Sequence, residues 1–249
     1  MSLTLKLVLT PVLVAQAVAT RARLPRLPEA EGPREGEAGD AASAAPALRL
    51  LVAGDSSAAG VGVARQRQAL APQLGERVAE HLGARVRWRL HAQSGLTSAQ
   101  TLALLQQAAP LAPAEIAVVV TGVNDLIDQV PSRRAVAHRE ALANWLRNAQ
   151  GVHHVVFAPL PPVHHFPGLP QPLRWVAGSD ARRHNDALRD WAAGRSDVSV
   201  PEMDAPLNPG TMARAGFHPG EPVYRYCASA IAEHIATAVW PTLPKEPAR

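Results

Sequence analysis

Short apolar runs alternate with longer segments of helical periodicity along most of this chain. The strand-like runs are 48–53, 86–91, 116–121 and 155–159, with a weaker run at 198–200. Between them, apolar residues recur at intervals of three and four over 66–81, 98–109, 134–148, 179–193 and 222–238. Strands that alternate with helices predict parallel βαβ units. We therefore expect a three-layer, flavodoxin-like α/β sandwich with a parallel sheet of about five strands.

Composition excludes several other classes of protein. Hydrophobic residues make up 47% of the 249-residue chain and charged residues 18%, which supplies a sizeable core and excludes a wholly disordered chain. A single cysteine, Cys227, excludes a disulfide-stapled scaffold, and its apolar helical neighbours predict a core position. The net charge of +4 comes from scattered arginines, so we expect no nucleic-acid partner.

The N-terminal residues 1–23 form an apolar segment that favours targeting or membrane contact. Residues 3–19 are apolar apart from Lys6 and polar spacers, and arginines follow them. Three interpretations stay open: a cleaved export signal, a helix that touches or anchors in a membrane through 3–19, and an ordinary docked helix. Pro11 and the short length argue against a full span. The protein is accordingly exported to the periplasm or medium, membrane-associated, or cytoplasmic.

Residues 24–46 differ in composition from what precedes and follows them. Proline, glycine, glutamate and alanine dominate, with no apolar period to bury. This composition is typical of a flexible connector. The sequence thus predicts a linker over 24–46 and a folded domain over 47–249.

A serine follows the first strand of this domain in the tripeptide Gly54-Asp55-Ser56. In a parallel sheet the carboxyl ends of the strands share one edge, where such folds place their sites. A sharp turn there into a helix would give Ser56 backbone N–H groups that stabilise an oxyanion, as a nucleophile needs. The alternative is a serine that only caps a helix.

Three further polar positions fall on the same expected edge. Gly95 follows the second strand, Asn124 follows the third within Gly-Val-Asn-Asp, and His218 precedes Pro219 and the last helix. Each has a structural alternative: a turn glycine, an Asx turn, or a loop histidine. An imidazole with a pKa near neutrality is the base that a serine hydroxyl requires.

These four motifs, in this order, resemble the SGNH hydrolases, also called the GDSL esterase/lipase family, over residues 48–238. The resemblance implies that Ser56 is the nucleophile and His218 the general base. It also implies an oxyanion hole made by the N–H of Ser56, the N–H of Gly95 and the side-chain amide of Asn124. The expected substrate is a small-molecule or lipid ester, with no cofactor.

One position departs from the family pattern. The resemblance places an aspartate three residues before the histidine, where this chain has Ala215. Either another group, such as Glu221, Asp204 or Asp180, holds the imidazole, or the enzyme works as a Ser-His dyad. Glu221 is also explained as the residue that begins the last helix beside Pro222.

The segment 159–175 is rich in proline and lacks a regular period. Long irregular segments on a catalytic edge are often functional loops, so we expect Phe166 and Trp175 to line an acyl pocket or lid. A rigid surface loop is the alternative. The paired histidines at 153–154 and 164–165 are not expected to bind a metal, because neighbours on a strand point to opposite faces.

The sequence therefore predicts a serine esterase or lipase that hydrolyses carboxylic esters through an acyl-serine intermediate. Two alternatives remain. One is a deacylase of carbohydrates or envelope lipids, and the other is a catalytically weakened binding protein, which Ala215 suggests.

Overall fold

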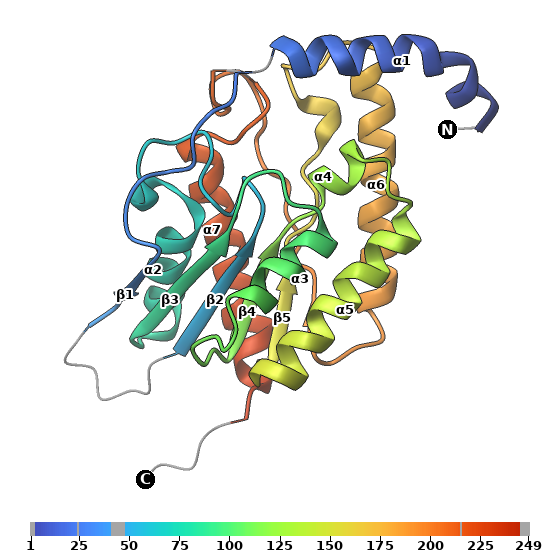
Figure 1. Ribbon diagram of the computed structural model, residues 1–249. Coiled ribbons are helices and arrows are strands. Elements are labelled where there is room, and N and C mark those ends of the chain that lie inside the picture. Colours follow the sequence, from blue (N-terminus) through green and yellow to red (C-terminus); the bar gives the residue numbers. More distant parts are fainter. Residues whose placement is uncertain (1–2, 24, 41–47, 215, 245–249) are drawn as a thin grey trace.

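The computed structural model describes residues 3–23, 25–40, 48–214 and 216–244 (Figure 1). Its centre is a six-stranded sheet in the order β1-β3-β2-β4-β5-β6. The strands are β1 (Glu35–Ala38), β2 (Leu48–Gly54), β3 (Val86–Ala92), β4 (Ile116–Val120), β5 (His154–Phe157) and β6 (Val198–Ser199). All neighbours pair in parallel except β1, which lies antiparallel to β3 at one edge.

Helices cover both faces of the sheet, as the alternating pattern predicted. On one face, α2 (Leu70–Leu82) and α7 (Glu221–His234) pack against inward residues such as Leu50 and Val52. On the other, α3 (Ser98–Gln107), α5 (Ser132–Gln150) and α6 (Leu173–Ala192) cover Leu51 and Val119. Alternate residues of the buried strands thus enter two separate cores. The predicted three-layer α/β fold is confirmed.

The expected flexible connector at 24–46 needs correction for residues 29–38. Strand β1 pairs along β3, with Gly36 against the ring of Trp88 and ion pairs from Glu35 and Glu37 to the arginines of β3. An edge strand can be held by backbone hydrogen bonds without an apolar run, so the composition of residues 35–38 did not indicate a strand. The part of the chain that packs on the sheet begins well before residue 47. Residues 41–47, where the predicted boundary falls, lie outside the described residues.

Several helix limits also differ from the prediction. The segment 66–68 is a short 3-10 helix, η1 (Gln66–Gln68), and α2 starts at Leu70. Helix α6 starts at Leu173, within the segment expected to be irregular, which also contains η2 (Val163–His165). The last helix continues as η3 (Ile235–Val239) and η4 (Trp240–Thr242).

Helix α1 (Leu3–Arg23) lies across the carboxyl edge of the sheet, above the start of α6 (Figure 1). Leu13 of α1 is buried. The side chain of Gln16, also on α1, donates to the carbonyl of Gln171 at 2.6 Å and accepts from the N–H of Leu173 at 3.0 Å. One face of α1 is therefore docked on the domain. None of the helices in the described ranges has the length and apolar character needed to span a membrane.

Candidate active site

Ser56 stands in a tight turn directly after β2. The N–H of Asp55 donates to the carbonyl of Val120 at 3.0 Å, which ties this turn to the end of β4. Gly54 has φ +152°, and a side chain there would meet the carbonyl oxygen of Val120 at 1.9 Å, so only glycine fits. The chain then makes consecutive turns, and α2 begins only at Leu70. The expected helix N-terminus at Ser56 is therefore wrong, although Ser56 is half-buried at the expected edge of the sheet.

His218 lies in the loop that leads into α7. Its carbonyl accepts from the N–H of Ala213 at 2.9 Å, and the ring of Phe217 packs against its imidazole at 5.3 Å. Burial lowers the pKa of His218, so the imidazole is neutral and able to accept a proton at neutral pH. No hydrogen bond joins Ser56 to His218 among the residues that the structure describes. Apo sites often close such contacts only when substrate binds.

Ser56 and His218 line the same apolar pocket. Helix α7 contributes Tyr224 and Cys227, and the loop after β5 contributes Phe166. The remaining wall is almost entirely apolar and includes Leu70, Val123, Leu160, Met203, Leu207, Met212 and Phe217. Cys227 is only partly buried as a residue, but its thiol is enclosed, and burial raises its pKa to about 12.

The structure places the two predicted pocket aromatics differently. Phe166 is 3% exposed and lines the pocket. Trp175 does not line it and is 42% exposed on the first turn of α6, near the docked face of α1. The helix begins earlier than its sequence suggested, and this carries Trp175 out of the loop.

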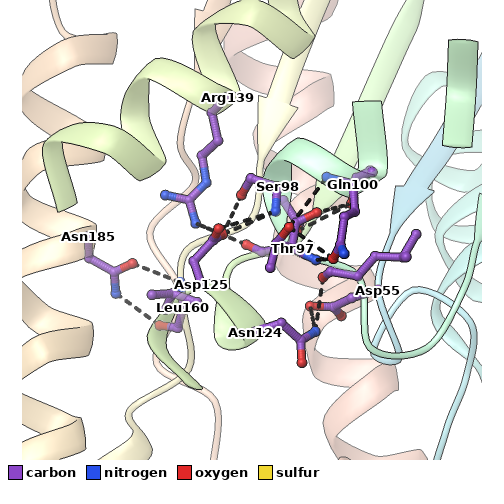
Figure 2. Close-up of polar contacts among 12 residues, drawn as sticks. Asp55, Thr97, Ser98, Gln100, Asn124, Asp125, Arg139, Leu160 and Asn185 are labelled. Carbon is purple, nitrogen blue, oxygen red and sulfur yellow. Dashed lines mark hydrogen bonds and ion pairs between the residues drawn. The ribbon is translucent and has the colours of Figure 1, made fainter. Parts of the chain in front are cut away.

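The predicted oxyanion donors come from the ends of β3 and β4. Gly95 has φ +87°, and its neighbour Ser94 donates its N–H to Glu29 at 2.7 Å. Asn124 lies in the short helix α4 (Val123–Ile127), and its side-chain amide lies 3.0 Å from the carbonyl of Leu96 (Figure 2). Neither Gly95 nor Asn124 belongs to the apolar wall of the pocket. The link that joins Asn124 to the Ser56 turn is the contact of its side-chain amide with Asp55 at 3.4 Å.

Asp55 is a site residue that the sequence prediction missed. Its carboxyl group is 2% exposed, accepts from the N–H of Ser57 at 3.0 Å and lies 3.4 Å from the amide nitrogen of Asn124. Burial raises the pKa of Asp55 to about 7, although the N–H of Ser57 opposes this shift. The sequence showed Asp55 only as the middle residue of the Gly54-Asp55-Ser56 motif. Nothing in the motif indicated that the carboxyl group of Asp55 would be buried and contact Asn124.

A buried polar network holds the loop that carries Asn124 (Figure 2). The hydroxyl of Ser98 donates to Asp125 at 2.5 Å, and the guanidinium of Arg139 lies 4.0 Å from the same carboxylate. Arg139 also donates to the carbonyl of Thr121 at 3.2 Å and fills the space where Gly122 would otherwise carry a side chain. Asp125 and Arg139 are almost fully buried, so this pairing fixes α4 relative to α3 and α5.

Two of the three carboxylates proposed as partners of His218 form ion pairs with arginines. Glu221 accepts from Gln68 at 2.9 Å and pairs with Arg225 on α7, Asp180 pairs with Arg183 on α6, and Asp204 is exposed. Within the described ranges, none of the three is hydrogen-bonded to His218. Position 215, where the family pattern has its aspartate, lies outside the described residues.

The paired histidines do not converge with other ligands. Across the described ranges, no three side chains of His, Cys, Asp or Glu gather as a metal site would require. The rings of His164 and His165 lie against each other at 4.1 Å, and His154 contacts Ser199 at the far end of the sheet.

The sheet has helices on both faces, and a pocket that contains Ser56 and His218 lies at its carboxyl edge. This fold and this pocket are those of an α/β enzyme. The chain belongs to the GDSL-like lipase/acylhydrolase family, whose model matches residues 52–226. It is accordingly a carboxylic ester hydrolase.

Solved structures of several ester hydrolases have the same fold. A lipolytic protein of the G-D-S-L family from Veillonella parvula is 17% identical with a TM-score of 0.57, over 76% of this chain and 99% of its own. A lipase from a goat rumen metagenome is 18% identical with a TM-score of 0.57, over 77% and 98%. A carbohydrate acetylesterase from Sinorhizobium meliloti is 13% identical with a TM-score of 0.54, over 76% and 98%. A comparison with curated proteins finds no match.

Proposed function

We propose that this enzyme hydrolyses carboxylic esters through an acyl intermediate on Ser56, with His218 as the general base. The observation that carries this proposal is the common pocket. Ser56 from the turn after β2 and His218 from the loop before α7 line one apolar cavity, although they are far apart in the sequence. A hydroxyl beside a neutral imidazole, next to an apolar wall, suits attack on an acyl group.

The steps follow from these groups. His218 accepts the proton of the Ser56 hydroxyl as its oxygen attacks the ester carbonyl, and the carbonyl oxygen takes the negative charge. The N–H groups of Ser56 and Gly95 and the amide of Asn124 donate to that oxyanion, each lowering the barrier by about 3 kcal/mol. The intermediate collapses, and His218 returns the proton to the leaving alcohol. A water molecule then repeats the sequence in reverse, releasing the acid and restoring Ser56.

The pocket favours esters of short acyl chains. Its volume is about 90 Å³, which is small beside the roughly 300–1,000 Å³ of pockets that enclose larger ligands. Its wall is apolar, so the acyl chain and not a charged or sugar group is the part that it accepts. The alcohol lies outside the pocket, and both a small-molecule and a lipid ester fit this arrangement.

A labelling experiment tests the assignment. Ser56→Ala is expected to lose hydrolysis of p-nitrophenyl acetate and labelling by a fluorophosphonate, with an unchanged circular dichroism spectrum. Ser57→Ala is the matched control, because Ser57 is adjacent and lines the same pocket. His218→Ala is expected to lose turnover while it keeps the fold. A label on another serine, or turnover that survives Ser56→Ala, contradicts the proposal.

A further inference from the structure

The exposed large apolar side chains of this protein gather at one end. Within the ranges that the structure describes there are six of them, on α1, on α4 and at the start of α6. They are Val8, Val12, Val14, Val18, Ile127 and Trp175, between 42% and 71% exposed. These three elements lie at the carboxyl edge of the sheet, above the strand ends (Figure 1). The opposite end of the molecule shows no such group in the described ranges.

Helix α1 has two distinct faces. Leu13 and Gln16 face the domain, where Gln16 is hydrogen-bonded to the start of α6. The opposite face presents Val8, Val14 and Val18, with Pro11 and Ala15 among them, and Val12 lies at its border. A helix that faces only water is usually polar on its outer side. Contiguous exposed apolar surface of this kind marks an interaction site.

The charges on α1 and just after it are positive, although the exposed Asp128 follows Ile127 on the α4 side of the face. Helix α1 contains no acidic residue, and it ends in Arg21 and Arg23, with the exposed Arg26 shortly after. Trp175, whose N–H is polar and whose ring is apolar, has the amphipathic character of residues at membrane–water interfaces. A second copy of the same face would bring its arginines against these, whereas anionic headgroups attract them.

We propose that the outer face of α1, together with Trp175 and Ile127, docks on an anionic lipid surface. The helix lies flat in the interface, because its inner face is already held by Gln16 on α6. The valines enter the headgroup region, and the arginines contact lipid phosphates. The turn that carries Ser56 follows β2 at the same carboxyl edge of the sheet, so docking brings the pocket close to the bilayer. The docking itself does not depend on the catalytic roles proposed for those two residues.

Vesicle flotation with the full chain tests the proposal. The wild type is expected to float with phosphatidylcholine vesicles that contain phosphatidylglycerol, and much less with phosphatidylcholine alone. Val14→Asp with Val18→Asp, at two exposed positions one turn apart on the outer face, is expected to lower binding by at least about tenfold, since apolar contact and charge attraction act together. The matched control is Thr237→Asp with Ala238→Asp, which adds the same charge on η3 at the far end. Arg21→Gln with Arg23→Gln is expected to remove the preference for anionic vesicles.

Four outcomes overturn the proposal. The first is that the wild type does not float with the anionic vesicles. The second is that the double valine variant floats as well as the wild type. The third is that the protein resists extraction from vesicles at alkaline pH, as a protein with an inserted span would. The fourth is a dimer, measured by light scattering without vesicles, that forms in the wild type and not in the double valine variant. That result would assign the face to self-association. Hydrolysis of soluble p-nitrophenyl acetate reports folding of each variant, so loss of docking is distinguishable from failure of the catalytic assignment.

Discussion

The side-chain amide of Asn124 lies 3.4 Å from the carboxyl group of Asp55, the residue directly before Ser56. This contact joins the turn after β2 to the helix after β4, so it couples the position of the nucleophile to that of an oxyanion donor. Asp55 is buried and also accepts from the N–H of Ser57. We infer that Asp55 is a positioning residue, which acts through Asn124 and does not touch substrate.

Asp55→Asn is expected to lower kcat by about 10- to 100-fold with little change in KM, because asparagine has one acceptor oxygen for the two donors that Asp55 holds, the N–H of Ser57 and the amide of Asn124. Asn124→Ala alone is expected to cost about 10²- to 10³-fold in kcat, as the loss of one oxyanion donor does. A double-mutant cycle distinguishes this role from a general loss of stability. In the Asn124→Ala background the effect of Asp55→Asn should largely vanish, and fully multiplicative effects would show that Asp55 acts elsewhere.

Restoring a carboxylate at position 215 is expected to raise kcat. Glu221 and Asp180 form ion pairs with arginines, and no hydrogen bond joins Asp204 to His218 in the described ranges, so we expect a dyad and not a displaced triad. Loss of the triad aspartate in a serine protease, where asparagine imposes the wrong tautomer, costs about 10⁴ in kcat. Alanine imposes no tautomer, so we expect Ala215→Asp to gain about 10- to 10³-fold, mainly in kcat.

The controls for this gain are Glu221→Gln and Asp180→Asn. Each should leave kcat within about twofold, because neither carboxylate is hydrogen-bonded to His218 in the part of the chain that the structure describes. Steady-state kinetics on a short-chain ester measures all three variants. A flat response to Ala215→Asp, with a fall in kcat for either control, would instead favour a displaced triad.

Two N-terminal truncations are expected to differ in stability. Removal of 1–24 deletes α1 and should leave a folded domain, since α1 contacts it mainly through Leu13 and Gln16. Removal of 1–44 also deletes β1, which uncovers the ring of Trp88 and the edge of β3. Exposing such a ring costs about 2 kcal/mol or more in the free energy of unfolding. Urea unfolding measures the difference, and equal midpoints would mean that β1 adds no stability.

The sequence was most informative where burial repeats along the chain. The strands β2 to β5 and their helices follow from apolar periodicity, and the motif order located Ser56, Gly95, Asn124 and His218 near one edge. It missed β1, because that strand pairs through its backbone and through ion pairs of Glu35 and Glu37, which no apolar pattern records. It also missed Asp55, because the partners that bury it come from other strand ends.

Phe166 and Trp175 are expected to have different effects on acyl-chain preference. Phe166 lines the pocket, so Phe166→Leu should raise the ratio of octanoate to acetate hydrolysis by enlarging the cavity. Leucine is chosen because alanine at a buried phenylalanine costs about 3–5 kcal/mol and endangers the fold. Trp175→Ala should leave the ratio unchanged with soluble p-nitrophenyl esters. A larger shift from Trp175 than from Phe166 would mean that the acyl chain binds along α6 instead.

A buried cluster at the far end of the sheet is expected to make stability depend on pH. The hydroxyl of Ser199 lies 2.8 Å from Nε2 of His154 and 2.7 Å from Nε2 of His234. Burial lowers the pKa of both histidines, and His234 lowers that of His154 further. The folded state therefore holds both rings neutral at a pH where the unfolded chain, with a histidine pKa near 6.5, begins to bind protons.

The free energy of unfolding should consequently be greatest above pH 6.5 and fall as pH drops below it, because the unfolded state then binds more protons. His234→Gln removes one of the two titrating rings and should flatten this slope. His81→Gln, at an exposed histidine of α2, is the matched control and should keep it. Ser199→Ala should cost about 1 kcal/mol at neutral pH, because it removes the hydrogen-bond partner that two partly buried ring nitrogens share. Urea unfolding between pH 5 and 8, a window set by the downward shifts from 6.5, measures each slope. An unchanged slope in His234→Gln would show that the cluster does not set the pH dependence.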